Sequence, residues 1–448
     1  MLTEHVHSQP LASVRAAEGS DMAATLTNWA GNHPFSTGRL HRPRSVDEIH
    51  DIVRRSLRVK VLGTRHSFND IADTTGDLIS LEKLDRIVSL DGESRHASVT
   101  IEGGMTCGRL GEQLHAAGFA LHNLASLPHI SVAGACSTAT HGSGDQNRNL
   151  ATAVSKMEIV TAAGDTAVFS RNSGPGLLEG AAVSLGGIGV IVRLTLDIVP
   201  AFDIAQEVYE DLPLTALRQH FNAITSSAYS VSLFTDWRSE LVNQVWLKHR
   251  VVEAEHGKLN LGALGARPAD RDLHPIKAIS PRTCTPQLRV AGPAHERLPH
   301  FRMNYLPSSG EELQSEYLIP REYAIDAIMA IHTIRDRISP LLQISEIRTI
   351  ARDDLWMSPC YQQSCVGIHF TWKKDWPAVR ALLPEIEQVL APFKARPHWG
   401  KLFTLSAREL HSLYPRVADF QQLLLNHDPQ GKFRNAFLDR YVLSQPAG

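Results

Sequence analysis

The pattern of hydrophobic and polar positions changes near residue 200. Before it, short β-branched runs such as SVTIE at 98–102 stand between turn residues and predict brief strands. After it, strand-like runs alternate with longer stretches whose apolar residues recur at helical spacing, as in 376–393. This change predicts an α+β protein with an N-terminal half of short elements and a second half that mixes sheet and helix.

Local signals predict several individual elements. Ser45, followed three residues later by Glu48, is a capping-box pattern and predicts a helix that continues through Val53. The segment 107–119 predicts a helix stopped by Gly118, and 154–170 predicts a hairpin. The stretch 253–299 is rich in Pro, Gly and His with weak periodicity, so we expect a long excursion and not a core element.

Composition argues against some classes of partner but does not identify the function. The 448 residues are 43% hydrophobic with a net charge of -2, which gives no electrostatic reason for a nucleic-acid or anionic-membrane partner. No apolar run approaches the roughly 20 residues that cross a bilayer. The first 25 residues are polar and lack the apolar centre of a secretory signal. We therefore expect residues 1–27 to be a disordered leader and the compartment to be the cytoplasm.

Cysteines and histidines give no sign of disulfides or metals. The five cysteines are odd in number and form no CxxC pair, and buried, inert thiols are the interpretation for Cys107 and Cys136. The run HERLPH at 295–300 resembles a zinc-protease helix, but it has one residue too many and Pro299 would break the helix. The sequence predicts no metal site.

The loop at 61–69, VLGTRHSFN, is the first candidate for chemistry. A short buried strand leads into a turn that exposes Thr, His, Ser and Asn together with successive backbone amides. Such amides form an anion-binding concavity that suits a pyrophosphate. A histidine in a polar loop is, by itself, more often a solvated side chain, so this loop alone does not establish a binding site.

The segment 123–144 is built almost entirely of small residues. Small side chains let the backbone approach a flat ligand closely, and hydroxyls with amides bind phosphate oxygens. The interspersed Leu, Ile and Val favour a buried segment over a flexible Gly/Ser loop. A further glycine-rich run, LGGIG at 185–189, precedes a strand instead of following one, so it is not a Rossmann fingerprint.

Polar pairs in the second half suggest a site for hydroxyl groups. Strand alternation places Glu346 and Arg348 on one face of one strand, and His369 and Thr371 on one face of another. An acid, a cation, an imidazole and a hydroxyl are the mixture of donors and acceptors that a polyol needs. The alternative is a salt-bridged sheet surface, and these residues alone favour it slightly.

Taken in order, the motifs resemble one family, the FAD-linked oxidases of the vanillyl-alcohol-oxidase type, and within it most closely the alditol (xylitol/sorbitol) oxidases. The resemblance spans about residues 28–437. It rests on GxxHSFN at 63–69, ASLPHISVAG at 125–134, THGSG at 140–144, EIR at 346–348, HWGK at 398–401 and GKFxNxF at 431–437.

The resemblance implies a PCMH-type FAD-binding domain in 28–199, a mixed sheet-and-helix substrate (cap) domain in 200–430, and a segment, 431–448, that returns to the first domain. It implies FAD attached covalently through its 8α-methyl group to His66. The cofactor-binding residues that it implies are Val61, Leu62, Gly63, Thr64, Arg65, His66, Ser67, Phe68, Asn69, Ser126, Ser131, Gly134, Thr138, Ala139, Thr140, His141, Val192 and Lys401.

The resemblance also implies the reaction: hydride transfer from a carbinol carbon of a small polyol to flavin N5, with O2 as acceptor and H2O2 as product. Arg348 and Lys401 are expected to stabilise the developing alkoxide, and Glu346 is the third catalytic candidate. A monomer is expected. The substrate-binding residues that it implies are Ser126, Glu346, Arg348, His369, Thr371 and Lys401.

Two alternatives stay open. A sugar-lactone oxidase or dehydrogenase of the same family shares the EIR and HWGK motifs, and a flavin-free binding protein of the same fold is a candidate from another class. One departure from the family is Arg65, where several members have glycine immediately before the linking histidine. A cationic side chain there could contact a phosphate.

Overall fold

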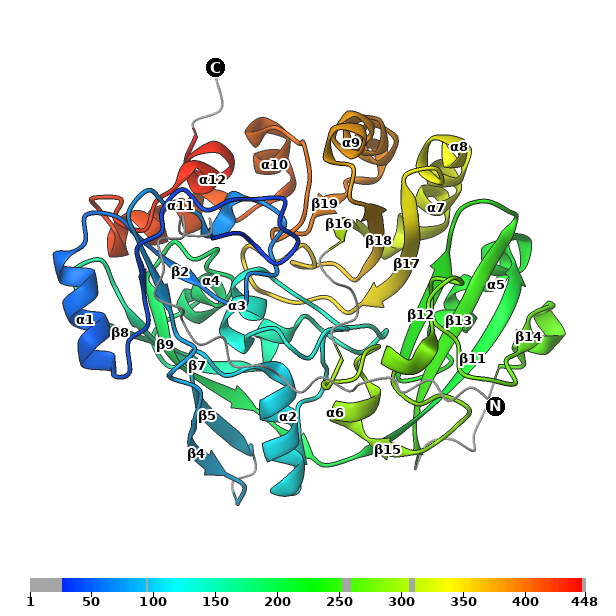
Figure 1. Ribbon diagram of the computed structural model, residues 1–448, viewed down its shortest axis with the longest axis horizontal. Coiled ribbons are helices and arrows are strands. Elements are labelled where there is room, and N and C mark those ends of the chain that lie inside the picture. Colours follow the sequence, from blue (N-terminus) through cyan, green and yellow to red (C-terminus); the bar gives the residue numbers. More distant parts are fainter. Residues whose placement is uncertain (1–25, 94–95, 252–258, 306–310, 445–448) are drawn as a thin grey trace, which may run out of the picture.

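The computed structural model describes residues 26–93, 96–251, 259–305 and 311–444 (Figure 1). The leader predicted over 1–27 therefore lies almost entirely outside the described residues. Its last two residues are described: the Leu26 carbonyl accepts a hydrogen bond from the Phe35 amide, and Thr27 pairs with Pro34 in an isolated bridge. None of the helices within these ranges is long and apolar enough to span a bilayer.

A small parallel sheet opens the first part. Its order is β1 (Leu40–His41), β3 (Asp77–Ser80), β2 (Val59–Leu62), and α1 (Val46–Arg55) connects β1 to β2. The predicted N-cap is confirmed, since Ser45 accepts from the Glu48 amide. The carboxylate of Glu48 accepts instead from the Arg44 amide at 2.8 Å, one residue earlier than in a capping box. α1 buries its apolar stripe in a cluster shared by both sheets of this part.

A five-stranded antiparallel sheet completes the first part. Its order is β4 (Ile87–Asp91), β5 (Ser98–Glu102), β9 (Val190–Asp197), β7 (Val154–Val160), β8 (Thr166–Ser170). The predicted hairpin is β7–β8, which turns through Gly164 at φ 78°. The predicted helix is α2 (Cys107–Ala116), and Gly118 at φ 83° ends it. The remaining helices are α3 (Val132–Ser137) and α4 (Leu177–Ala182).

A nine-stranded sheet dominates the second part. Its antiparallel pairs follow the order β14 (Arg267–Pro268), β11, β13, β12, β17, β18, β16, β19 (Arg396–Pro397), with β15 (Gly292–Pro293) beside β11. The long strands are β11 (Asp203–Pro213), β12 (Ser230–Thr235), β13 (Leu241–Arg250), β16 (Glu312–Pro320), β17 (Leu342–Ile350) and β18 (Cys365–Lys373). α5 (Leu214–Thr225), α7 (Ala324–Thr333) and α9 (Trp376–Leu390) lie on the outer side of the molecule, and α5 and α7 contact the sheet (Figure 1).

The excursion expected at 253–299 carries only short elements in its described residues, 259–299. These are η4 (Leu261–Leu264), β14 (Arg267–Pro268), η5 (Pro281–Thr283), β15 (Gly292–Pro293) and α6 (Ala294–Arg297). β14 and β15 both pair with β11, so the excursion is fastened to the edge of the sheet.

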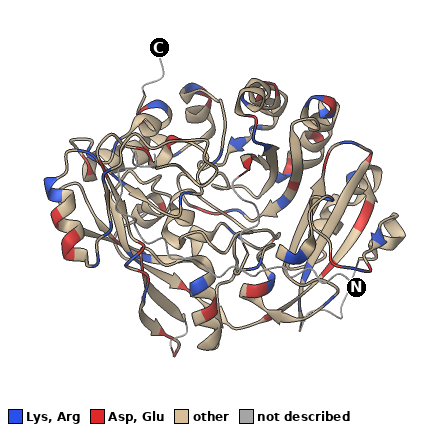
Figure 2. Ribbon diagram, viewed as in Figure 1, with Lys and Arg blue, Asp and Glu red and all other residues tan. Residues whose placement is uncertain are grey.

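The end of the chain packs against the first part. α11 (Val417–His427) contacts α4, and α12 (Ala436–Leu438) contacts η1 (Asp70–Ala72), so this contact begins before residue 431. The side-chain Nδ2 of Asn435 donates to the backbone carbonyls of Asp70, Ile71 and Asp73. Positive and negative side chains are interspersed over the described chain (Figure 2), and the whole sequence carries 45 Lys and Arg against 47 Asp and Glu.

Candidate active site

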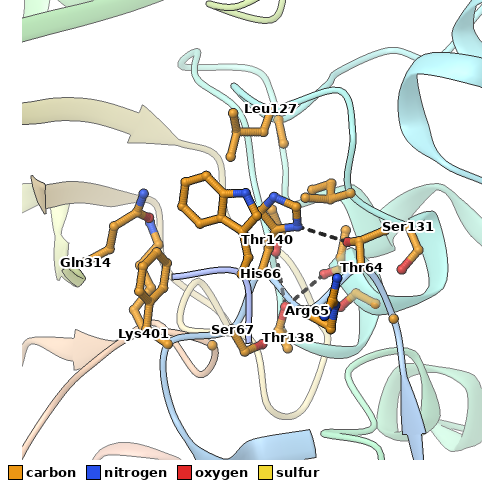
Figure 3. Close-up of a pocket in the computed structure, with 18 of the residues that line it drawn as sticks. Thr64, Arg65, His66, Ser67, Leu127, Ser131, Thr138, Thr140, Gln314 and Lys401 are labelled. Atoms are coloured by element: carbon orange, nitrogen blue, oxygen red, sulfur yellow. Dashed lines mark hydrogen bonds between the residues drawn. The ribbon is translucent and has the colours of Figure 1, made fainter. Parts of the chain in front are cut away.

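A cavity of about 660 Å3 is lined by both parts of the molecule. One side, the cofactor wall, consists of the lining residues of 61–69, 103–104, 125–140 and 184–191. The other, the sheet wall, consists of the lining residues of β16, β17 and β18 with 398–401. The volume lies within the usual range for ligand and cofactor sites. Figure 3 shows Gln314 and Lys401 across the cavity from Ser131.

The loop at 61–69 is held from both parts. β2 ends at Leu62, and Arg65 adopts φ 65°, the left-handed conformation that favours glycine. The Phe68 backbone amide donates to the Gly400 carbonyl at 2.8 Å, and the Asn69 side-chain Nδ2 donates to the carbonyls of Trp399 and Lys401, each at 2.8 Å. The segment that supplies Lys401 is thereby fixed to the histidine loop.

His66 is placed for chemistry at one of its ring nitrogens. Its ring stacks on Trp29, with centroids 5.1 Å apart and an interplanar angle of 22°. Nδ1 lies 3.2 Å from the Thr64 hydroxyl (Figure 3). Burial lowers the pKa of His66 to about 4, so the imidazole is neutral at physiological pH and keeps a nitrogen lone pair. A neutral imidazole is the form that can attack an electrophilic carbon.

The cofactor wall is shaped by glycines where side chains would collide. A Cβ at Gly63 or Gly134 would lie 2.9 or 2.7 Å from the Ser131 hydroxyl, and one at Gly104 would lie 1.9 Å from the Leu81 carbonyl oxygen. The hydroxyls of Thr138 and Thr140, 3.1 Å apart, add polar groups (Figure 3). Exposed backbone, hydroxyls and a neutral histidine in one groove fit a flat ring joined to a pyrophosphate, as in FAD.

Most, but not all, of the predicted cofactor residues line this cavity. Ala139 and Val192 do not line it, and a role for them in binding the cofactor stays a prediction. Ala139 packs in the main core, and Val192 packs in the cluster beneath α1. Ile191 lines the cavity instead of Val192, because successive strand residues point to opposite faces. Those that line it are Val61 to Asn69, Ser126, Ser131, Gly134, Thr138, Thr140, His141 and Lys401.

Strand register assembles the sheet wall. Glu346 on β17 lies opposite His369 on β18, and His369 lies opposite Glu316 on β16. The predicted pairs share faces as alternation requires: Arg348 Nε lies 3.6 Å from Glu346 Oε1, and His369 Nε2 lies 3.0 Å from the Thr371 hydroxyl. The alternative of a surface salt-bridged sheet is wrong, since all of these side chains are buried.

Glu316 is the central residue of this wall, and sequence reasoning missed it. Its side chain is 0% exposed. Oε1 accepts from Arg348 Nη2 at 2.8 Å, and Oε2 accepts from Lys401 Nζ at 2.5 Å. Although burial opposes ionisation, Lys401 and Arg348 hold the pKa of Glu316 well below its ordinary value. We call Glu316, Glu346, Arg348 and Lys401 the charge cluster.

Lys401 also fixes the protonation of His369. Its ammonium lies 2.8 Å from His369 Nδ1, which must act as the acceptor. The other nitrogen, Nε2, then carries the hydrogen and donates to Thr371. Burial, with the nearby Lys401 charge, lowers the pKa of His369 to about 4. His369 is therefore a neutral side chain that lies between Lys401 and Thr371, accepting from the first and donating to the second.

Glu346 is supported from behind by a second missed pair. His300 Nε2 donates to Glu346 Oε1 at 2.8 Å, and Lys248 Nζ lies 3.2 Å from His300 Nδ1. Burial lowers the pKa of His300 to about 4 and that of Lys248 to about 7. His300 belongs to the run that was compared with a zinc-protease helix. Its partner there, His295, instead packs beside His115, with ring centroids 5.2 Å apart.

Comparison with known proteins decides the family. Residues 39–170 match a family model described as an FAD binding domain, and 307–441 match one described as D-arabinono-1,4-lactone oxidase. An alditol oxidase from a Streptomyces species is 46% identical over 420 residues, covering 93% of this chain and 99% of that protein. The chain belongs to this family of FAD-linked oxidases.

More distant relatives agree on the fold. An L-gulono-1,4-lactone dehydrogenase of Mycobacterium tuberculosis is 27% identical over 441 residues, 94% of this chain and 100% of that protein. The crystal structure of cholesterol oxidase from B. sterolicum superposes with a TM-score of 0.74 at 13% identity, covering 93% of this chain and 96% of that one. The predicted fold class, an FAD-binding domain with a mixed sheet-and-helix second domain, is confirmed.

In this FAD-linked oxidase, the charge cluster leaves hydrogen-bonding capacity for a ligand. Two of the three Lys401 ammonium hydrogens are used by Glu316 and His369, and the third is left over within the described part of the chain. Arg348 uses one Nη2 hydrogen on Glu316 and one Nη1 hydrogen on the Ser126 hydroxyl at 3.3 Å, so further N–H groups remain. Among the described residues, no donor reaches Glu346 Oε2.

The missed residues share one property, which is that long-range packing places them. Glu316 and Gln314 alternate along β16 and both line the cavity, and this alternation was the one signal in the sequence that could have grouped them. His300 reaches the cavity from the end of the excursion, and Lys248 reaches His300 from β13. Nothing local in the sequence connects those two segments.

Proposed function

We propose that this protein oxidises alditols such as xylitol or sorbitol, with FAD as cofactor and O2 as acceptor. A carbinol loses two electrons and two protons to become a carbonyl, and O2 gains both to become H2O2. The observation that carries the proposal is the charge cluster, where a buried arginine, a lysine that is 14% exposed and two buried carboxylates face one cavity and leave hydrogen-bonding capacity for a ligand. Neutral hydroxyl groups need both donors and acceptors, which this wall offers.

The cofactor wall supports a covalent attachment of FAD at His66. Bound FAD supplies the hydride acceptor, which no amino-acid side chain can provide. The neutral imidazole of His66 offers a nitrogen for the 8α bond, while Trp29 fixes the plane of its ring. Glycines at 63, 103, 104 and 134, with the hydroxyls of Ser131, Thr138 and Thr140, would hold the rest of the cofactor.

The sheet wall would orient and polarise the reacting hydroxyl. The spare hydrogens of Lys401 and Arg348 would hold its oxygen and stabilise the negative charge that develops there. Glu346 Oε2 and the Thr371 hydroxyl would bind neighbouring hydroxyl groups, and Ser126, already bonded to Arg348, lies where the two walls meet. Enclosure in a cavity strengthens each of these interactions relative to water.

The test of the cofactor proposal is the visible spectrum followed by acid precipitation. We expect flavin absorption that stays with the precipitated wild-type protein and that is lost from the precipitate of a His66→Ala variant. Release of the wild-type colour into the supernatant would overturn the covalent bond and keep the flavoenzyme. A colourless protein, even after incubation with FAD, would overturn the functional proposal.

A sugar-lactone oxidase or dehydrogenase is the second candidate. It is favoured by the match of 307–441 to the lactone-oxidase family model and by relatives at 27% identity, a value below the 46% identity to the alditol oxidase. The flavin-free alternative is disfavoured by the FAD-domain match and by the shape of the cofactor wall. The expected monomeric state and the cytoplasmic location stay predictions.

A further inference from the structure

Glu316 is a fully buried carboxylate that contacts both cations of the cavity wall. Each of its oxygens takes one cation, Arg348 at 2.8 Å and Lys401 at 2.5 Å. The strand beside it leaves the space that it needs, because a Cβ at Gly367 on β18 would lie 3.0 Å from Glu316 Oε1. A buried charge costs free energy unless it is paired, so this placement needs a compensating role.

The groups that face Glu316 come from every element packed around it. Arg348 belongs to β17, His369 to β18, His398 and Lys401 to the segment after β19 (Arg396–Pro397), and His141 to the loop after α3. Glu316 Oε1 lies 3.4 Å from His141 Nε2, and Oε2 lies 3.6 Å from His369 Nδ1.

The histidines in this set do not replace the carboxylate as a counter-charge. His141 Nδ1 lies 2.9 Å from the Gly142 carbonyl, and His398 Nδ1 accepts from the Gly400 amide. Burial lowers the pKa of His398 well below its ordinary value and that of His369 to about 4, so both are neutral. Within the set that faces Glu316, it is the one group able to carry a negative charge.

We propose that Glu316 is a positioning residue that sets Arg348 and Lys401 at a fixed separation and keeps the Lys401 ammonium protonated during turnover. This inference rests on the proposed function and extends it to a residue outside the family motifs in the sequence. Burial lowers the pKa of Lys401, and the Glu316 carboxylate opposes that effect. Glu346 acts in the same direction, so without the Glu316 carboxylate the Lys401 pKa would fall further, and a smaller fraction of the protein would carry the ammonium that stabilises an alkoxide.

The first test compares Glu316→Gln with the matched variant Glu387→Gln. Glu387 is likewise buried, accepts from Tyr317 and Thr404, and does not line the cavity. In Glu316→Gln we expect kcat/KM for the alditol at pH 7.5 to fall roughly 10²-fold, with a larger change in kcat than in KM. Glu387→Gln should stay within about twofold of wild type in kcat/KM, since oxyanion stabilisation is untouched.

The pH profile separates this role from a merely structural one. Activity should fall at the pH where the Lys401 ammonium loses its proton. Because Glu316→Gln lowers the Lys401 pKa, the alkaline limb of the kcat profile should move to lower pH by about 1–3 pH units. Glu316→Asp, which keeps the charge, should retain the wild-type limb. A limb that does not move in Glu316→Gln, with kcat/KM within twofold of wild type, would overturn the proposal.

A thermal measurement keeps the proposal testable where Glu316→Gln folds poorly. That variant removes the carboxylate that pairs with both Arg348 and Lys401, so the remaining positive charges repel each other and its Tm should fall by roughly 5–10 °C. The double variant Glu316→Gln/Lys401→Met removes one charge of each sign and should regain at least half of this loss. A double variant no more stable than Glu316→Gln would show that Glu316 does not act through Lys401.

These outcomes are distinct from failure of the proposed function. The Tm comparison reads the coupling between Glu316 and Lys401 without any substrate, and flavin absorbance in each variant shows that the cofactor wall is intact. If the wild-type protein oxidises no polyol, the proposed function fails. If the wild type is active while the pH limb and the Tm pattern are unchanged, only the role of Glu316 fails.

Discussion

The two walls of the cavity are built by opposite strategies. The cofactor wall relies on missing side chains: at glycines 63, 104 and 134 a Cβ would collide with the Ser131 hydroxyl or the Leu81 carbonyl oxygen, so backbone and hydroxyl groups pack closely there. The sheet wall relies instead on charged side chains from β16, β17 and the segment after β19, each paired with a side chain of opposite charge. The cofactor wall should therefore be sensitive to added volume, and the sheet wall to removed charge.

This difference follows from what each ligand requires. FAD brings its own charge and reactive ring, so the protein need only enclose it and supply amide and hydroxyl dipoles. A polyol brings neutral hydroxyls that become charged only during the reaction, so the protein must keep fixed charges ready. Keeping four ionised groups out of water requires mutual pairing, which explains why the members of the charge cluster contact one another.

The largest effect should come from removing a charge from the sheet wall. Arg348→Ala leaves Glu316 and Glu346 with one buried cation fewer and deletes donors to the reacting oxygen. We expect kcat/KM for alditols to fall about 10²–10³-fold, measured by peroxide release. Arg396→Ala is the control, since Arg396 is equally buried but donates to the carbonyls of Pro359 and Tyr361 away from the cavity. Full activity of Arg348→Ala on every polyol would contradict the account.

Acid should destabilise the sheet wall through two neutral histidines, His369 within it and His300 behind it. The pKa of His300 and that of His369 are each lowered from 6.5 to about 4. Between these pH values both histidines are protonated in the unfolded chain but neutral in the folded protein. The stability that each histidine contributes is therefore fully present above about pH 6.5 and is lost as pH falls toward 4. The loss in unfolding free energy is on the order of 3 kcal/mol per histidine.

The measurement is the Tm at pH 7 and at pH 4.5. His300→Gln, which cannot titrate, should lose fewer degrees between the two pH values than the wild type. An equal loss in both proteins would show that His300 does not stay neutral in the folded state.

Added volume should act on the cofactor wall instead. In Gly104→Ala the new Cβ would meet the Leu81 carbonyl oxygen, which belongs to the backbone and cannot move aside cheaply. We expect a loss of about 1–3 kcal/mol in stability and less bound flavin per protein. Gly38→Ala, where nothing lies within 4 Å of the added atom, should change neither quantity. Normal flavin content in Gly104→Ala would argue against this segment as part of the cofactor site.

The smallest effect concerns Arg65, the departure from the family pattern. Its guanidinium donates to the Thr27 carbonyl at 3.2 Å, and its backbone holds φ 65°. Arg65→Gly should be more stable than Arg65→Ala by about 1 kcal/mol, because glycine adopts this conformation without strain. Both variants should keep the wild-type flavin content. Loss of flavin in both would instead place the guanidinium on a cofactor phosphate.

The sequence predicted those features that are local in the chain. The Ser45 cap, the Gly118 helix stop and the 154–170 hairpin each depend on residues a few positions apart, and all three are present. The histidine loop was also visible, because a strand, a turn and its polar residues are contiguous. Alternation even placed Glu346 with Arg348 and His369 with Thr371 on the correct faces.

What the sequence did not reveal depends on strand register and on long connections. Glu316 meets Arg348 and Lys401 only because β16 pairs with β18 and β18 with β17, and 85 positions separate it from Lys401. His300 lies at the end of the excursion, and the weak periodicity there correctly predicted no core element. Nothing in the sequence indicated that this end of the excursion would reach the cavity. At the strand entry the motif pointed to Val192, whereas its neighbour Ile191 lines the cavity.

The most direct test of the account is a comparison of xylitol with L-gulono-1,4-lactone as substrates of the purified holoprotein under air. O2 uptake and H2O2 release are followed together for each substrate over a range of concentrations. The account predicts one H2O2 per O2 and a kcat/KM for xylitol at least about tenfold above that for the lactone. Faster turnover of the lactone, or no O2 uptake with any alditol, would contradict it.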